Sequence, residues 1–265
     1  MDDQNWHGGS KPLTLDEAKV SIALTAVSGG LFEDGDDLPT LGETPERVAL
    51  LENRDLLDMA RLGRASTPLD LLNYRAEDLQ PSIFFTKEDP RQSILTVFNW
   101  TESSRSHHIT LSDLGLAPGS NYIMTDVLDS KPVAHAIAGS LNLTLAPHSV
   151  RMLKIVNKAV ASHSPVATVS SPSSGSAGET LHFAAEPATP SDAIVHYRWD
   201  FGDGVVADGS KAAHTYTHDG TFHVALIVTG LNGVVGRSSS SLTITGAVST
   251  RFHPEEQRRL ESNPQ

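Results

Sequence analysis

The chain has 265 residues and contains no cysteine. It therefore has no disulfide framework, no thiolate ligands for a metal and no cysteine nucleophile. The absence does not assign a cellular compartment, because large bacterial domains outside the cytoplasm also fold without disulfides.

Long apolar runs are absent as well. No stretch reaches the roughly 20 apolar residues that a membrane-spanning helix needs. The first residues, MDDQNWHGGSKPLTL, include early acids and lack the apolar core of a signal peptide. The sequence predicts no membrane span, and no signal peptide is visible in it.

Basic residues are outnumbered, with 20 Lys and Arg against 32 Asp and Glu, for a formal net charge of −12. A surplus of negative charge repels the phosphates of nucleic acids and the surface of an anionic membrane. Neither is an expected partner.

Residues 1–66 have the pattern of a helix, a short strand and a second helix. Thr14 and Glu17 have the spacing of a capping box, and a run rich in Ala, Ile, Leu and Val follows them. The second helix is predicted to begin at Thr44-Pro45-Glu46 and to end at Gly63. The segment between the helices, GGLFEDGDDLPTL, favours a short strand or a strand-like loop. One strand without a sheet partner cannot bury both faces, so this unit is expected to belong to something larger.

The rest of the chain is predicted to be β-structure, because short segments alternate apolar and polar residues between turns. Residues 67–157 are expected to form an antiparallel β-sandwich, and residues 158–247 a small immunoglobulin-like sandwich. The Ser/Pro/Ala/Gly-rich stretch at 158–178 indicates a linker that runs into the first edge strand. A charged tail occupies 248–265. The predicted fold class is therefore mainly β, with two sandwiches behind an N-terminal α/β segment.

The segment YRWDFGDG, residues 197–204, is the densest cluster of unusual residues. Alternation directs Tyr197, Trp199 and Phe201 to the core and leaves Asp200 outside, after which Gly202-Asp203-Gly204 turns the chain. A calcium site would need six or more oxygens, which two aspartates and a carbonyl do not supply. Catalysis would need an acid/base partner that the segment lacks. A structural role accounts for every position.

This segment, followed by HTYTHDGTFHVALIVTG at 214–230, resembles the polycystic kidney disease (PKD) domain. Further matching positions downstream are His214, Tyr216, Gly220, Phe222, Val224 and Leu226; the family more often has Tyr where Phe222 stands. The resemblance implies an immunoglobulin-like spacer or adhesion module, usually extracellular and often appended to enzymes that degrade polysaccharides or proteins.

Asp36 and Asp37 follow the short segment predicted between the two helices. They could line a substrate site, but neighbouring residues of a strand point to opposite faces, so the two carboxylates cannot easily face each other across a glycosidic bond. A polar turn with aspartate caps is the alternative interpretation.

The first 157 residues resemble the end of a melibiase-type α-galactosidase, an α/β-barrel glycoside hydrolase with a C-terminal antiparallel domain. The segments that carry the resemblance are Gly30-Leu31, Asp37-Leu38, Leu51 with Asn53 and Leu57, Phe98-Asn99-Trp100, Asp113-Leu114-Gly115-Leu116 and the closing stretch Leu145 to Leu153. The family's Asn-Gln-Asp-Pro-x-Gly motif is absent, and DMARLG stands in its place.

The resemblance implies that residues 1–66 are the remnant of a TIM barrel. A complete barrel takes about 250 residues, and the family's catalytic aspartates lie on earlier strands with no counterpart here. We therefore expect no catalytic residue in the chain, a separate or missing catalytic barrel as partner, and a truncated start or a split gene as the origin.

The twelve histidines do not predict a metal site, because no HExxH or comparable helical pair occurs. No GxSxG elbow, Walker loop or dinucleotide fingerprint is found either, so no cofactor is expected.

Two functions follow as hypotheses. The first is the non-catalytic C-terminal portion of a secreted α-galactosidase-like glycoside hydrolase with a PKD spacer. The alternative is a free-standing PKD-containing protein that binds carbohydrate or a cell surface. A complete small enzyme that uses Asp36 or Asp37 is a third possibility. The expected ligands are galactosides or a polysaccharide, and the expected location is outside the cytoplasm, on the strength of the resemblance.

Overall fold

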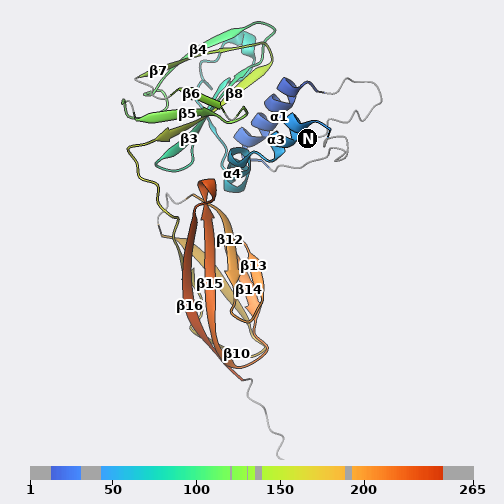
Figure 1. The fold of residues 1–265 in the computed structure, drawn as a ribbon, viewed down its shortest axis with the longest axis vertical. Coiled ribbons are helices and arrows are strands. Elements are labelled where there is room, and N and C mark those ends of the chain that lie inside the picture. The colour runs from blue at the N-terminus through green and yellow to red at the C-terminus, as the bar shows by residue number, and fades with distance from the viewer. Residues whose placement is uncertain are drawn as a thin grey trace, which may run out of the picture. The chain divides into compact units, whose positions relative to one another are not determined.

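A computed structural model describes residues 13–30, 43–119, 121–129, 131–134, 139–188 and 193–246. The chain divides into two compact units (Figure 1). The first comprises Met1–Pro165 with Thr189–Val195 and Thr229–Val235, and the second comprises Val166–Ala188, His196–Val228 and Gly236–Gln265. The chain is mainly β, with two sandwich-like parts and a small helical N-terminal part.

Helix α1, Leu15–Ser28, begins at the capping box that the sequence predicts. The Thr14 hydroxyl accepts the N–H of Glu17, and the Glu17 carboxylate accepts the N–H of Thr14, which completes the capping box. Gly29 ends the helix in the left-handed conformation, with φ 67°. A Cβ at Gly29 would lie 2.6 Å from the main-chain nitrogen of Ala65, so the close approach of these segments also requires glycine.

The single helix predicted from Thr44 to Gly63 is wrong, because two helices fill this range. Helix α3 spans Pro45–Leu51 and helix α4 spans Arg54–Leu62. Asn53 separates them: it has extended dihedrals, its side-chain oxygen accepts the N–H of Leu56, and its amide donates to the carbonyl of Val127. An asparagine that caps a helix start competes with continuation of the preceding helix. The strand predicted between α1 and α3 lies outside the described residues.

A six-stranded antiparallel sheet forms the centre of the first unit, in the order β1-β2-β3-β8-β5-β6. Its strands are β1 Thr67–Pro68, β2 Ile83–Lys87, β3 Gln92–Asn99, β8 Ser149–Asn157, β5 Tyr122–Asp126 and β6 Lys131–Ala134. Every residue of β3 is buried. The sheet is therefore covered on both faces.

The two faces of β3 belong to two different cores. Leu95 and Val97 pack in one core with residues of β4 Arg105–Thr110 and β7 Ser140–Leu145, which form a second, two-stranded sheet. Ile94 and Phe98 pack in the other core, against α1, α3 and α4 (Figure 1). The helices thus bury their apolar sides on the sheet, which is how the N-terminal segment gains the partner it lacks by itself.

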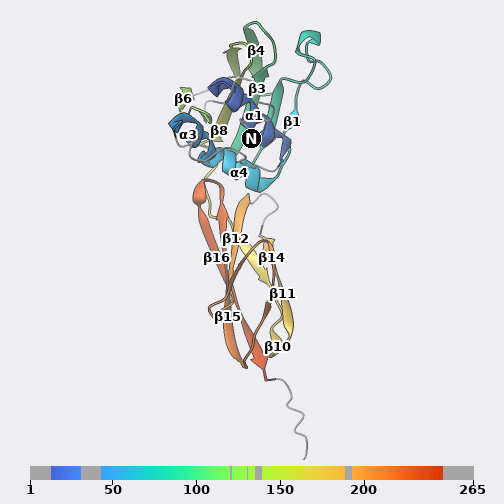
Figure 2. The same cartoon turned by 90° about the vertical axis from the view of Figure 1, so that its right-hand side faces the viewer.

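The second sandwich-like part has a five-stranded sheet in the order β10-β16-β15-β12-β13 and a three-stranded sheet in the order β14-β11-β9 (Figure 2). The strands are β9 Ala167–Ser170, β10 Ser174–Ser176, β11 Thr180–Pro187, β12 Ile194–Asp200, β13 Val206–Asp208, β14 Lys211–Thr215, β15 Gly220–Gly230 and β16 Val235–Thr245. Inward residues two apart form the core, as the alternation predicts; they include Leu181, Phe183, Val224, Leu226, Val228, Leu242 and Ile244.

The linker predicted over 158–178 is shorter in the structure. Ala167–Ser170 and Ser174–Ser176 already form strands, each paired with a neighbour. Serine-rich composition does not exclude a strand whose main chain is paired in a sheet. The boundaries predicted for the domains at 66, 157 and 247 stay predictions.

Candidate functional site

The aromatic residues of YRWDFGDG lie along β12 and the turn after it. Trp199 and Phe201 are fully buried, and the indole N–H of Trp199 donates to the carbonyl of Gly209 at 2.9 Å. Tyr197 is only half-buried, whereas alternation places it in the core. The ring of Phe183 packs against both buried aromatics, with centroid distances of 6.0 and 5.1 Å.

The aspartates of the segment hold the turn that follows. The Asp200 carboxylate accepts the N–H of Gly202 at 2.9 Å, and Oδ1 of Asp203 accepts the N–H of Val205 at 3.1 Å. Gly202 has φ 79°, and a Cβ there would lie 2.7 Å from the carbonyl oxygen of His223. Gly204 also has positive φ, 91°, but open space around it. Both conformations favour glycine.

His214 completes this cluster from strand β14. Its Nε2 lies 2.7 Å from Oδ2 of Asp203, and its ring stacks on Phe201 at 4.3 Å. Partial burial acts to raise the pKa of Asp203, but the hydrogen bonds from His214 and Val205 outweigh it and hold that pKa below its usual range.

Tyr216, just after β14, also contacts this turn. Its hydroxyl donates to the carbonyl of Phe201 at 2.9 Å. Burial, together with the charges of Asp203 and Asp200, raises the pKa of Tyr216 to about 12. Gly220 begins β15 with φ 154°. The polar side chains of this signature are engaged in holding a strand and its turn.

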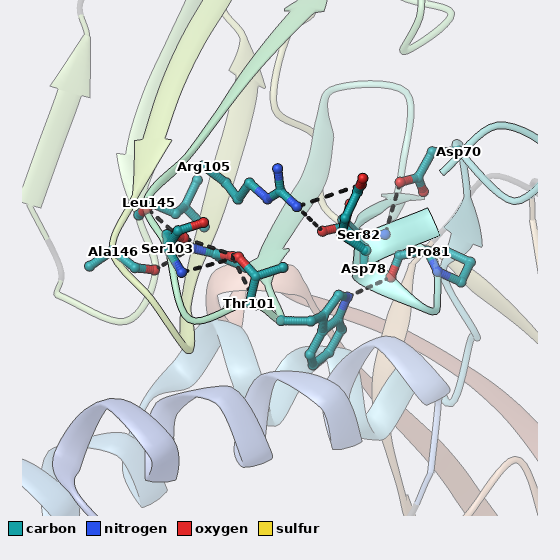
Figure 3. A network of polar contacts seen from close by, with 12 residues as sticks. Asp70, Asp78, Pro81, Ser82, Thr101, Ser103, Arg105, Leu145 and Ala146 are labelled. Atoms are coloured by element: carbon teal, nitrogen blue, oxygen red, sulfur yellow. Dashed lines mark hydrogen bonds and ion pairs between the residues drawn. The ribbon is translucent and has the colours of Figure 1, made fainter. Parts of the chain in front are cut away.

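A second polar network lies in the first unit, around Asn99 at the end of β3 (Figure 3). The buried amide of Asn99 donates to three carbonyls, those of Ser103, Leu145 and Ala146, at 2.8, 3.3 and 2.7 Å. Its oxygen accepts both the N–H and the hydroxyl of Thr101. The sequence indicated Asn99 only as part of the motif Phe98-Asn99-Trp100 and on a strand face, and it predicted none of these hydrogen bonds.

The same network fixes the loop between β1 and β2. Arg105 lies 3.5 Å from the buried carboxylate of Asp78, and the indole N–H of Trp100 donates to the carbonyl of Pro81 (Figure 3). The Asp70 carboxylate accepts the N–H groups of Ser82 and Ile83. These contacts immobilise both ends of the loop.

The loop nevertheless exposes apolar side chains. Leu72 is 98% exposed, Leu79 is 84% exposed and Leu71 is 53% exposed. Leu79 also has φ 60°, which is uncommon for a residue other than glycine. In Figure 2 the loop runs out beyond β1. The loop therefore combines fixed ends with three exposed leucines.

The described residues contain no group of three or more His, Cys, Asp or Glu that could hold a metal ion. Asp36 and Asp37, the predicted substrate-lining residues, lie outside the described residues. Of the other histidines, His107 is partly buried, and burial followed by the charge of Arg75 lowers its pKa.

Comparison with known proteins assigns the second β-sandwich. Residues 162–246 match the family model of the PKD domain. This segment is a PKD domain. The microbial collagenase of Vibrio alginolyticus is 33% identical over 87 residues, which are 32% of this chain and 11% of that protein. The chain thus spans about a tenth of that relative's length.

Solved structures resemble both parts. The PKD1 domain of Vibrio anguillarum Epp is 22% identical, with a TM-score of 0.29, and the match covers 32% of this chain and 98% of that one. The α-galactosidase I of Mortierella vinacea is 16% identical, with a TM-score of 0.41, and the match covers 59% of this chain and 39% of that one. Both families suggested by the sequence motifs are thus found among the similar proteins.

Among the described residues, no helix is long and apolar enough to cross a membrane.

Proposed function

We propose that this chain is the non-catalytic, carbohydrate-directed portion of an α-galactosidase-like glycoside hydrolase that acts outside the cytoplasm, with the PKD domain as its spacer and interaction module. The glycosidase part of the proposal rests on the motifs Phe98-Asn99-Trp100 and Asp113-Leu114-Gly115-Leu116. Both motifs have structural roles: Trp100 stacks on Phe98 at 4.4 Å, and Asp113 accepts the N–H of Thr110.

The non-catalytic part of the proposal is supported by the contacts of the two aspartates in YRWDFGDG. Asp200 and Asp203 hold main-chain N–H groups of the turn, and Asp203 also pairs with His214. General acid/base catalysis needs a carboxyl group free to exchange a proton with substrate, and here the pKa of Asp203 is lowered by its structural partners. These contacts support a structural role for the PKD aspartates.

The exposed loop between β1 and β2 supports a partner for the chain. Asp70 accepts a main-chain N–H at the end of this loop, and the buried Asp78 faces Arg105. The loop that they hold has leucines exposed to water. We expect this loop to contact an apolar face of the catalytic α/β barrel. We expect Leu72 and Leu79 to be covered in the complete enzyme.

The proposal is tested by locating the barrel and measuring its association with this chain. A barrel encoded in an adjacent gene, or one encoded in frame before Met1 and produced as a separate polypeptide, should co-purify with the chain. Leu72→Asp with Leu79→Asp should weaken this association. The double variant Glu52→Lys with Glu46→Lys, on exposed helix positions, serves as the surface control. The proposal would be contradicted if the locus encoded no barrel, or if the leucine substitutions left the association unchanged.

The alternative is a free-standing binding or adhesion protein. The observation that favours it is a hollow on the outer face of the three-stranded PKD sheet. A glycan array probed with the purified chain tests this alternative, because binding without any catalytic partner is its main expectation. Absence of binding to galactosides and plant polysaccharides would count against this alternative.

A further inference from the structure

The outer face of the three-stranded sheet β14-β11-β9 in the PKD domain is hollowed. Lys211, Ala184 and Ser170 are aligned across the three strands, and Ala213 and His182 form the next row. The hollow has a volume of about 530 Å³. The hollow is open to solvent, so it would contact one face of a ligand and leave the other face exposed.

Small side chains make the hollow shallow and flat. Ala184 and Ala213 stand in the two rows, and Pro172 also lines the hollow. Beside them the long side chains of Lys211 and His182 are exposed. A flat apolar floor next to hydrogen-bond donors suits a pyranose ring, which has an apolar face and polar edges.

The charge of the lining favours one class of sugar. Lys211 is the charged residue of the lining, His182 is a second potential cation, and no acid lines the hollow among the described residues. Glu186 lies on the same face one row further, opposite Thr168. The chain as a whole carries −12, but at physiological ionic strength charges are screened over about 8 Å. Lys211 stands directly opposite Ala184, whereas Glu186 is two residues further along β11, about 7 Å away and still inside that length. The ammonium group is therefore the nearer charge for a short ligand, and Glu186 weakens its attraction.

We propose that this hollow is a binding subsite for an acidic sugar unit, such as a uronic acid residue of a polysaccharide. The ring lies over Ala184 and Ala213, its carboxylate accepts a hydrogen bond from the Lys211 ammonium group, His182 contacts the ring from the opposite corner, and the Ser170 hydroxyl contacts a ring hydroxyl. This inference rests on the proposed carbohydrate-directed function and names its ligand class.

The test is calorimetric titration of the full chain with trigalacturonic acid, and with neutral galactotriose, in 0.15 M NaCl. The short acidic probe avoids the repulsion that a long polyanion would meet. Lys211→Ala is expected to weaken binding about fivefold, the size of an exposed ion pair. Lys211→Ala with His182→Ala should weaken it more than tenfold. Arg198→Ala removes an exposed cation from β12 of the other sheet and should leave binding unchanged.

Three results would overturn the inference: equal binding of the neutral trisaccharide, an affinity that Lys211→Ala does not change, or equally tight binding of triglutamate, which would show that the carboxylate alone is recognised. Each of these leaves the association with a catalytic barrel untouched. Failure of the proposed function would instead appear as a missing barrel or as no association with it, independently of whether the acidic sugar binds.

Discussion

Oδ2 of Asp203, in the turn between two strands of the five-stranded sheet, lies 2.7 Å from Nε2 of His214 in the three-stranded sheet of the PKD domain. Asp203 belongs to the turn after β12, and its other oxygen accepts the N–H of Val205 in that turn. His214 belongs to β14 and stacks on Phe201. One carboxylate therefore ties the turn of one sheet to a strand of the other.

Asp203→Asn is expected to lower the free energy of unfolding of the PKD domain by about 1 kcal/mol at pH 7. Because the pKa of Asp203 is lower in the folded state than in the unfolded chain, the carboxylate stabilises the fold above the unfolded pKa of about 4, and that contribution is lost as the pH falls further. The difference between wild type and variant should shrink from pH 7 to pH 3. Urea unfolding at several pH values measures it.

Asp208→Asn is the matched control for this prediction. Asp208 also faces a histidine, His196, at 3.2 Å, but its side chain is 64% exposed. An exposed pair contributes little, so no measurable change is expected. Equal effects of the two variants would contradict the account of the turn.

Gly202→Ala should destabilise the PKD domain by about 2–4 kcal/mol, because a left-handed residue other than glycine costs about 1–2 kcal/mol and the new Cβ meets the His223 carbonyl at 2.7 Å. Gly204 has positive φ but open space around it, so Gly204→Ala should be destabilised only by the cost of the left-handed conformation. Thermal unfolding of both variants separates the two contributions. A Gly204 variant as unstable as the Gly202 variant would argue against the close contact.

Much of the PKD domain could be predicted from the sequence, because its core residues alternate and its turn needs glycine. Trp199 and Phe201 are in the core for that reason. The break at Asn53 and the burial of both faces of β3 were not predictable from local pattern. Each depends on a tertiary partner: Val127 for the Asn53 amide, and helix α1 for the second face of β3.

The hydrogen-bond partners of Asn99 were not predicted, for the same reason. Its three carbonyl partners include Leu145 and Ala146, which lie more than forty residues further along the chain. Nothing in the local alternation indicates that a strand asparagine will receive such partners. Conversely, the predicted pair Asp36 and Asp37 lies outside the described residues, so its role stays a prediction.

Glu88→Gln is expected to stabilise the first unit at alkaline pH. Burial first, and then the charges of Asp55, Asp58 and Asp89, raise the pKa of Glu88 to about 7, against the hydrogen bond from Gln92. A carboxyl whose folded pKa is raised loses stability as the pH rises from about 4.5 through 7. The variant should match wild type near pH 4 and exceed it by on the order of 3 kcal/mol at pH 8.

Chemical unfolding at pH 4 and pH 8 measures this difference. Glu52→Gln, at an exposed position, should behave like wild type at both values. A Glu88→Gln variant whose advantage is the same at pH 4 and pH 8 would show that the ionisation of Glu88 is not the cause.

Asn99→Ala should lower the free energy of unfolding of the first unit by about 2–4 kcal/mol, because three carbonyls and the Thr101 N–H lose their partner in a buried place. Asn142→Ala, on the exposed side of β7, removes one contact to His108 and should change stability by less than about 0.5 kcal/mol. Urea unfolding of both variants gives the comparison. Similar small losses would contradict the role of Asn99.

The absence of catalysis in this chain is the central claim, and hydrolysis of an aryl α-galactoside tests it most directly. The purified chain should release no aryl product above the rate of the buffer, and product should appear only when a catalytic α/β barrel is added. Turnover by the chain alone that disappears in the Asp36→Ala/Asp37→Ala double variant would contradict the account, because the reacting carboxylates would then lie within this sequence.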